Sequence, residues 1–320
     1  MATYCVSGIY ANKVYNRSIY LSAGTQYVFE TRDLNGSDTY MYLVRGNTII
    51  TRNDDYRGLA SLIAYQPTVS GNYNLVIRSY SRYSRGTCDV YMSTGGGAPV
   101  KINNNSRFGG HPLYAHWKSD ERIETASSSA DPYLYLITGS TMYWNDDGGP
   151  GYHSRITPGW SGYGLVVVGS WSYATRGYTK ACIYYQSYLD NPGPDSDLVD
   201  DPDLILSDNH FNFQQELMKY KAKLEAMPMK KRMEITEDAI EGEVKALRDK
   251  ILSKEEIKSF EEPKVEIPKK LVKAEEEYKQ ILADAEKKLE GLDIPNRQKE
   301  MRKIEFQKSE IYRGLVPLDE

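Results

Sequence analysis

The fold is decided by a stretch that occurs twice. Its first copy is Asp38-Thr39-Tyr40-Met41-Tyr42-Leu43, followed by Gly46 and Asn53-Asp54-Asp55; its second copy is Asp131-Pro132-Tyr133-Leu134-Tyr135-Leu136, followed by Gly139 and Asn145-Asp146-Asp147. Both copies alternate with period two, so the tyrosines share one face of a strand and the apolar residues share the other. The pattern predicts a half-buried strand, a glycine turn, a second short strand and a closing turn of Asn and Asp.

The repeat extends well beyond this stretch. Gly71-Asn72-Tyr73-Asn74-Leu75-Val76 is matched by Gly162-Tyr163-Gly164-Leu165-Val166, and Ser79-Tyr80-Ser81 by Ser170-Trp171-Ser172. These matches indicate two copies of one module of roughly 95 residues. Short strands separated by Gly, Asn, Asp and Ser are typical of an antiparallel β-sandwich. We expect modules at residues 1–93 and 94–188, with the glycine-rich residues 93–99 as a flexible joint between them.

The rest of the chain has a different composition. Residues 1–188 contain 24 of the 27 tyrosines, whereas residues 211–320 contain 24 Lys/Arg and 25 Asp/Glu. Residues 189–210 hold seven Asp with no Lys or Arg, which predicts an extended acidic linker rich in proline. Neither main part has the one-sided positive charge that nucleic-acid binding needs, so we exclude that partner.

Helical periodicity begins at Phe211. We expect helices near 212–226, 230–252, 254–260, 269–290 and 295–312, separated by prolines. The apolar stripe is narrow, as in Leu271, Ala274 and Tyr278. Isolated helices of this kind need tertiary packing, so residues 211–320 are predicted to be a partner-binding region that docks on another protein or another copy. The expected fold class is multidomain β plus α: two antiparallel β-sandwich modules followed by an extended α-helical region.

Aromatic side chains are the candidates for ligand contact, because rings can stack on sugars or on proline-rich protein. The alternative is that they pack in the two cores. The candidates are Tyr40, Tyr42, Tyr133, Tyr135, Trp144, Tyr152, Trp160 and Trp171.

The acidic clusters are candidate calcium ligands. Carboxylate and amide oxygens suit a hard cation, although the same residues are ordinary turn formers. The candidates are Asp38, Asn53, Asp54, Asp55, Asp131, Asn145, Asp146 and Asp147. No other cofactor is expected.

Catalytic motifs are missing from the sequence. The four histidines, at 111, 116, 153 and 210, lack metal-site spacing, and neither a nucleophile elbow nor a phosphate-binding loop is present. We therefore expect a protein that is not an enzyme.

Three cysteines cannot form a disulfide framework. Either Cys5 pairs with Cys88 and leaves Cys182 free, or all three are buried thiols in a reducing compartment. The first ten residues lack a secretory signal and no 18-residue apolar run occurs, so no membrane span is expected. After synthesis in the cytoplasm, we expect an extracellular, surface or particle location.

Residues 1–188 resemble a known family. The order of an acidic D-x-Y-x-Y-L strand, a glycine turn, N-D-D, and a late strand followed by Tyr80-Ser81 or Trp171-Ser172 is similar to that of the bacterial pre-peptidase C-terminal domain. The resemblance implies a small β-sandwich related to collagen- and sugar-binding modules.

The helical region carries a second, weaker resemblance. Leu247-Arg248-Asp249-Lys250-Ile251-Leu252-Ser253-Lys254-Glu255-Glu256 is similar to the helical repeats of bacterial lipase-specific foldases. Two functions follow as expectations. The first is a non-enzymatic binding and assembly protein, whose sandwiches contact glycan, matrix or neighbouring subunits and whose helices dock onto a filament, virion or secretion apparatus. The alternative is a foldase-type chaperone whose helices embrace an exported hydrolase.

Overall fold

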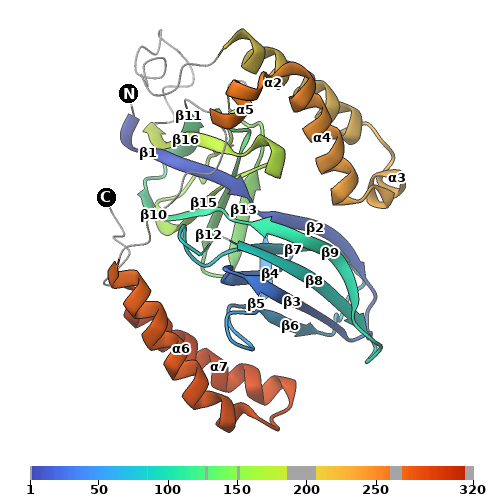
Figure 1. Cartoon of the computed structure of the whole chain (residues 1–320), viewed down its shortest axis with the longest axis vertical. Helices are drawn as coiled ribbons and strands as arrows, with labels where there is room; N and C mark the ends of the chain where they lie inside the picture. Colours follow the sequence, from blue (N-terminus) through green and yellow to red (C-terminus); the bar gives the residue numbers. More distant parts are fainter. Residues whose placement is uncertain are drawn as a thin grey trace. The chain divides into compact units, whose positions relative to one another are not determined.

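The computed structural model describes residues 2–84, 86–126, 129–149, 152–185, 207–259 and 269–313. The chain divides into two compact units. We call unit A the one formed by Tyr15–Gly109 and Lys264–Glu320, and unit B the one formed by Met1–Val14 and Gly110–Pro263. Both units combine a β-sandwich with helices: α6 and α7 in unit A, and α2 to α5 in unit B (Figure 1).

The sandwich of unit A consists of two four-stranded sheets, ordered β2-β7-β4-β5 and β6-β3-β8-β9. Its core takes Met41 and Leu75 from the first sheet and Phe29 and Val90 from the second, all fully buried. The strands are β2 (Tyr15–Leu21), β3 (Tyr27–Asn35), β4 (Thr39–Arg45), β5 (Thr48–Asn53), β6 (Leu62–Tyr65), β7 (Gly71–Ser79), β8 (Gly86–Thr94) and β9 (Val100–Phe108).

Unit B has two equivalent layers, ordered β10-β15-β12-β13 and β14-β11-β16-β1, and the end of β1 also pairs in parallel with β15, which joins the layers. Its core takes Leu134 and Val166 from one sheet and Ile9 and Ile183 from the other. The strands are β1 (Ala2–Lys13), β10 (His111–Trp117), β11 (Glu121–Ala126), β12 (Pro132–Thr138), β13 (Thr141–Asn145), β14 (Arg155–Ile156), β15 (Gly162–Ser170) and β16 (Gly177–Tyr185).

The two sandwiches match strand for strand, with one exchange. Strands β2 to β8 correspond in order to β10 to β16. Strand β8 pairs with β9, and its counterpart β16 pairs with β1, so β9 and β1 occupy equivalent places in the two sandwiches. Each repeat therefore gives its first strand to the sandwich of the other repeat. In Figure 1 the blue strand β1 runs beside β16, far from it in sequence.

The predicted boundary between modules is corrected by this exchange. Residues 1–13 belong with the second sandwich, and residues 100–108 with the first. The expected joint at residues 93–99 is the turn of the β8–β9 hairpin, where Gly95 and Gly96 adopt positive φ angles and the Gly97 N–H donates to the Thr94 carbonyl. Glycine accommodates this backbone without the steric cost of a side chain.

A disulfide joins β1 to β16. It links Cys5 and Cys182, which are directly paired across the two strands. Cys88 is a buried free thiol. Both expectations for the cysteines are therefore wrong, because they assumed that β1 closes the sandwich of its own repeat or that no bridge forms.

The predicted fold class, β-sandwich modules followed by a helical region, is confirmed. The helices are α2 (Asp208–Glu225), α3 (Met229–Glu234), α4 (Glu237–Ile251), α5 (Lys254–Ser259), α6 (Lys269–Leu289) and α7 (Ile294–Arg313). The single helix expected over 230–252 is divided at Thr236, whose side chain accepts from the Ala239 N–H and starts a new helix. Most of the acidic linker, residues 189–206, lies outside the described residues.

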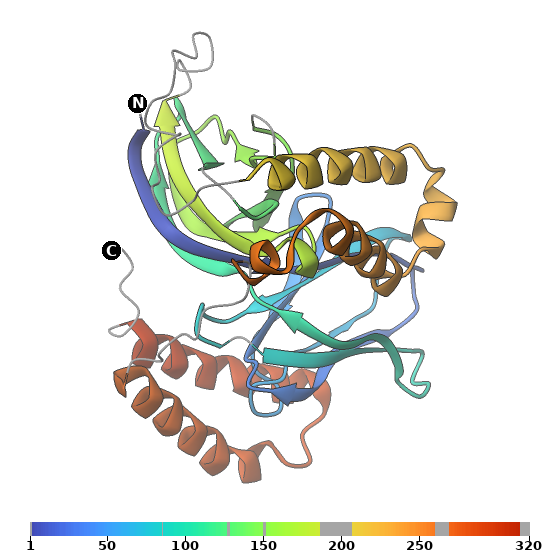
Figure 2. The ribbon, with the colours of Figure 1, turned by 45° about the horizontal axis from the view of Figure 1, so that its top comes forward.

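The helical region is two pairs rather than one element, which corrects the predicted domain at 211–320. Helices α2 and α4 bury Phe213, Leu217 and Val244 against Ala174 of unit B. Helices α6 and α7, side by side in Figures 1 and 2, bury Tyr278, Leu282 and Met301 with Leu59 of unit A packed against them. The narrow apolar stripes are thus covered by the β modules of the same chain.

None of the helices within the described ranges is long and apolar enough to span a membrane.

Candidate functional site

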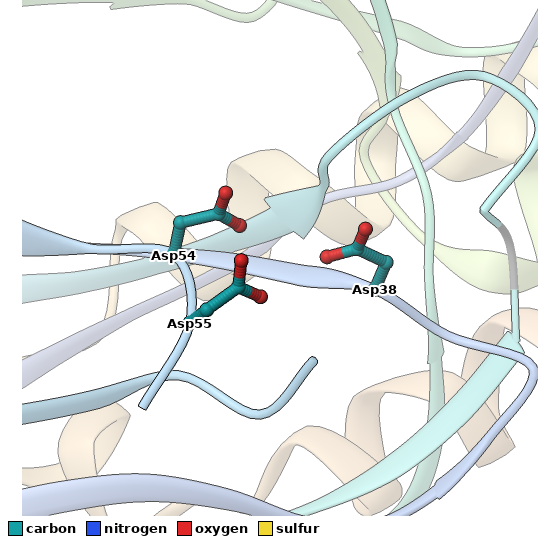
Figure 3. A group of neighbouring side chains, drawn as sticks. All are labelled: Asp38, Asp54 and Asp55. Carbon is teal, nitrogen blue, oxygen red and sulfur yellow. The ribbon is translucent and has the colours of Figure 1, made fainter. Parts of the chain in front are cut away.

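Three aspartates converge at one edge of the unit A sandwich. Asp38 immediately precedes β4, and Asp54 and Asp55 immediately follow β5, its hairpin partner. Because β4 and β5 are antiparallel, the start of one strand lies beside the end of the other. Figure 3 shows the three carboxylates turned toward one another, and the ligand oxygens lie within 4.8 Å of each other. We call this group socket A.

A lysine from α7 fills socket A. The Lys308 ammonium lies 2.9 Å from Asp38, 3.1 Å from Asp54 and 3.2 Å from Asp55, and its side chain is 0% exposed. It also lies 4.0 Å from the centre of the Tyr80 ring, a distance at which the ring face attracts a cation. The hydroxyl of Tyr278 on α6 donates to Asp55. Both helices of the pair therefore reach into the socket.

The repeat builds the same arrangement in unit B, which we call socket B. The Lys221 ammonium on α2 lies 2.7 Å from Asp131, 3.0 Å from Asp146 and 3.3 Å from Asp147. It lies 4.9 Å from the centre of the Trp171 ring. The backbone N–H of Trp171 donates to the backbone carbonyl of Asp131, and the backbone N–H of Tyr80 donates in the same way to the carbonyl of Asp38. The aromatic residue of the repeated Ser-aromatic-Ser motif is thus tied to the first aspartate of each socket.

Burial changes the protonation of the sockets. It raises the pKa of Asp38 to about 7, of Asp131 to about 6 and of Asp146 to about 8, in each case against the opposing pull of the lysine. Burial alone would lower the pKa of Lys308 and Lys221, but the surrounding carboxylates outweigh it and raise both. Each lysine is therefore a cation at neutral pH, and among the carboxylates around it Asp38, Asp131 and Asp146 take up protons near neutral pH.

Further polar contacts hold the helix pairs in place. In unit A, Arg297 donates to the Tyr56 carbonyl and pairs with Glu286, and Glu305 accepts from the Asp55 N–H. In unit B, Glu241 of α4 accepts from the Tyr173 N–H and from the Ser172 hydroxyl.

Glu241 also pairs with Lys13 at the end of β1, at 2.6 Å. A single carboxylate thus joins α4 both to the exchanged strand and to the turn that follows Trp171. The Lys13 ammonium lies near Glu237 as well, at 3.4 Å.

The predicted metal residues fall into two groups. The six aspartates converge as the calcium hypothesis requires, and each trio surrounds a lysine. The two asparagines serve the turns instead: Asn53 accepts from the Leu62 N–H, and Asn145 accepts from the Gly148 and Arg155 N–H groups.

The predicted aromatic ligand residues do not form one surface. Tyr42 and Tyr135 are buried, Trp171 belongs to socket B, and the other five are half-buried. These five are Tyr40, Tyr133, Trp144, Tyr152 and Trp160. The exposed rings include a different pair, Tyr114 on β10 and Tyr163 on β15, which stack with their centres 5.5 Å apart.

Sequence reasoning missed both socket lysines, although a signal was present. Lys308 occupies the apolar stripe of α7 that also contains Met301, Ile304 and Ile311. Lys221 occupies the stripe of Phe213, Leu217 and Leu224 on α2. A lysine at a core position of an amphipathic helix needs a buried acidic partner, which the repeated aspartates supply.

The chain matches no protein-family model, and a search of curated proteins finds no match.

Proposed function

We propose that this chain is a non-enzymatic binding and assembly protein in which each β-sandwich is a receptor for a lysine carried on a pair of helices. One observation carries the proposal: the same socket is built twice and holds a lysine both times. Lys221 lies on the first helix of its pair, whereas Lys308 lies on the last. The lysine that fills the socket comes from the first helix of one pair and from the last helix of the other. The socket therefore recognises a cation on a helix rather than one helix sequence.

The nature of the contacts supports docking between copies. A buried ion pair often adds little net stability compared with an apolar contact of the same size, and in this proposal its role is to specify which surfaces meet. Lys308 and Arg297 anchor α7 through charge and hydrogen bonds, beside a small apolar cluster. A helix pair recognised in this way can make the same contacts on the equivalent socket of a second copy, which is domain swapping. The prolines and acidic residues of the predicted linker at residues 189–210 favour an extended chain, which gives the helices the reach that this exchange needs.

The proposal includes a location outside the reducing cytoplasm, on a surface or in a particle. The disulfide between Cys5 and Cys182 supports it, because such bonds persist in oxidising compartments. A glycan or matrix contact is proposed only for the exposed stacked rings of Tyr114 and Tyr163. The resemblance of the modules to the pre-peptidase C-terminal domain remains part of the proposal.

The test is a complementation between two full-length variants. Lys308→Met keeps socket A but lacks its lysine, and Asp54→Asn/Asp55→Asn keeps the lysine but lacks two socket charges. Neither variant alone can form the complete pairing, whereas a mixture can, with α7 of one copy in socket A of the other. With one variant labelled with ¹⁵N, native mass spectrometry should show more mixed complexes than self-complexes of either variant.

A matched pair sets the baseline. Lys303 lies on α7 but is 66% exposed and pairs with Glu300 on its own helix, so labelled wild type mixed with Lys303→Met should give only background exchange. If the complementing variants do not exceed this background, and the wild type stays monomeric at every concentration, the helix pairs only complete their own chain and the assembly function is lost.

A further inference from the structure

Once their aspartates are ionised, the sockets carry more negative charge than one lysine balances. With all three aspartates of socket A ionised, Lys308 leaves a formal charge of −2 on side chains that are at most 5% exposed. One oxygen of Asp54 accepts no hydrogen bond from the described residues, although it is buried. Buried polar atoms are rarely left without a partner. This oxygen therefore has acceptor capacity that the bound lysine does not use.

The donor set defines which cation would fit. The groups that converge in each socket are carboxylates, with their ligand oxygens within 4.8 Å of one another. Three carboxylates are a donor set for a hard divalent cation such as Ca²⁺ or Mg²⁺. The bound lysine shows that a cation is stable in this place, but a metal ion and an ammonium group cannot occupy it together.

We propose that each socket has two alternative occupants, the helix lysine and a hard divalent cation of the calcium class, and that binding of the metal ion releases the lysine and its helix. The proposal rests on the proposed function, because it makes helix docking a cation-controlled step. The metal ion competes with docking of the lysine, so its apparent affinity is lower when a larger fraction of sockets holds the lysine.

Socket B exchanges its occupant more readily than socket A. The side chains of Asp146 and Asp147 are 25% and 29% exposed, whereas the socket A aspartates are at most 5% exposed. A hydrated ion can therefore reach two carboxylates of socket B while Lys221 is still bound. Socket A must open before an ion enters.

The test uses full-length Lys221→Met, which removes the competing ammonium from socket B. Calorimetric titration with Ca²⁺ should show binding at least about tenfold tighter than to the wild type. Terbium luminescence gives a second readout, because Trp171 lies beside the socket and can sensitise a bound lanthanide ion. Lys219→Met is the control: Lys219 is on the same helix but 70% exposed, so this variant should match the wild type.

A folded Lys221→Met protein, by circular dichroism, that binds Ca²⁺ no more tightly than the wild type would overturn the proposal. If that variant does not fold, hydrogen exchange on the wild type decides. Ca²⁺ should speed exchange of the α2 amides and leave β12 unchanged, and Asp146→Asn/Asp147→Asn should abolish the effect. Unchanged α2 exchange in Ca²⁺ would overturn it too. Failure of the mixing experiment alone, with calcium binding intact, would remove only the assembly function.

Discussion

Sockets A and B have equivalent aspartates and an equivalent aromatic ring, yet they differ in depth and in the helix that fills them. Lys308 is completely enclosed and its socket includes a tyrosine from the neighbouring helix, whereas Lys221 faces two aspartates that are partly exposed. The common part comes from the repeated β-strands, and the differences come from the helices, which do not repeat. The sandwich therefore defines the chemistry of binding, and the helix pair sets how firmly the lysine is held.

The largest effect is expected from Lys308→Met. It leaves three buried carboxylates without their counterion, and breaking a buried charge pair costs about 3–5 kcal/mol. The free energy of unfolding of unit A should fall by that amount, measured by urea denaturation. Lys303→Met, on the same helix, should change it by less than about 1 kcal/mol. Equal effects of both variants would mean that socket A does not hold α7.

The second prediction compares the two exchanged strands. Only the β1–β16 pair carries a disulfide, so Cys5→Ser/Cys182→Ser should destabilise unit B by about 2–4 kcal/mol. Thermal unfolding of the oxidised and serine forms would measure it.

The equivalent register in unit A pairs Cys88 with Ser106. If β9 does correspond to β1, Ser106→Cys should form a second disulfide, detectable as the loss of a free thiol by mass spectrometry. A variant that keeps both thiols under oxidising conditions would contradict that correspondence.

The smallest effect is a pH dependence. Because Asp38 in the folded state has a pKa raised to about 7, the folded protein binds a proton that the unfolded chain releases near pH 4. This contribution to stability is complete at low pH and is lost as the pH rises through about 7. The charged groups that face Asp38 are Lys308, Asp54, Asp55 and Glu275. Lys308, with its raised pKa, stays charged throughout this range.

Urea midpoints for unit A should accordingly be higher at pH 5.5 than at pH 8.5. Asp38→Asn should reduce the difference, since asparagine does not titrate, and Asp54, whose pKa burial also raises, should account for what remains. Glu241, whose pKa is lowered chiefly by Lys13 against the effect of burial, acts in the opposite direction but below this window. A wild type that is more stable at pH 8.5 would show that socket A keeps its aspartates fully ionised.

The sequence predicted the parts of the molecule that depend on local pattern. The alternation around Tyr40 and Tyr133 identified β4 and β12, and the Asn-Asp-Asp turns predicted where carboxylates would gather. Strand β9 is not apparent from the sequence, because Asn103, Asn104 and Asn105 break the alternation that marks a strand. The exchange of β9 and β1 could not be predicted for another reason. Both strands occupy the same position in the repeat, so either could pair with either sandwich.

The positions of Lys221 and Lys308 in apolar stripes are a signal in the sequence, but not a sufficient one. The helical region has many lysines, and most lie on exposed faces where charge needs no partner. Distinguishing Lys221 and Lys308 requires knowing that their stripes are buried and against which surface, which is a tertiary fact.

The exchanged strand β1 also constrains the order in which the chain can fold as it is synthesised. A growing chain releases its N-terminal segments first, and domains usually fold as they emerge. Strand β1 pairs with β16, which ends at Tyr185, so β1 must wait for almost the whole β region. The unit A sandwich, by contrast, is complete once Phe108 has emerged. Because long-range pairing of this kind is slow, closure of the unit B sandwich should be a late step in the folding of the chain during synthesis.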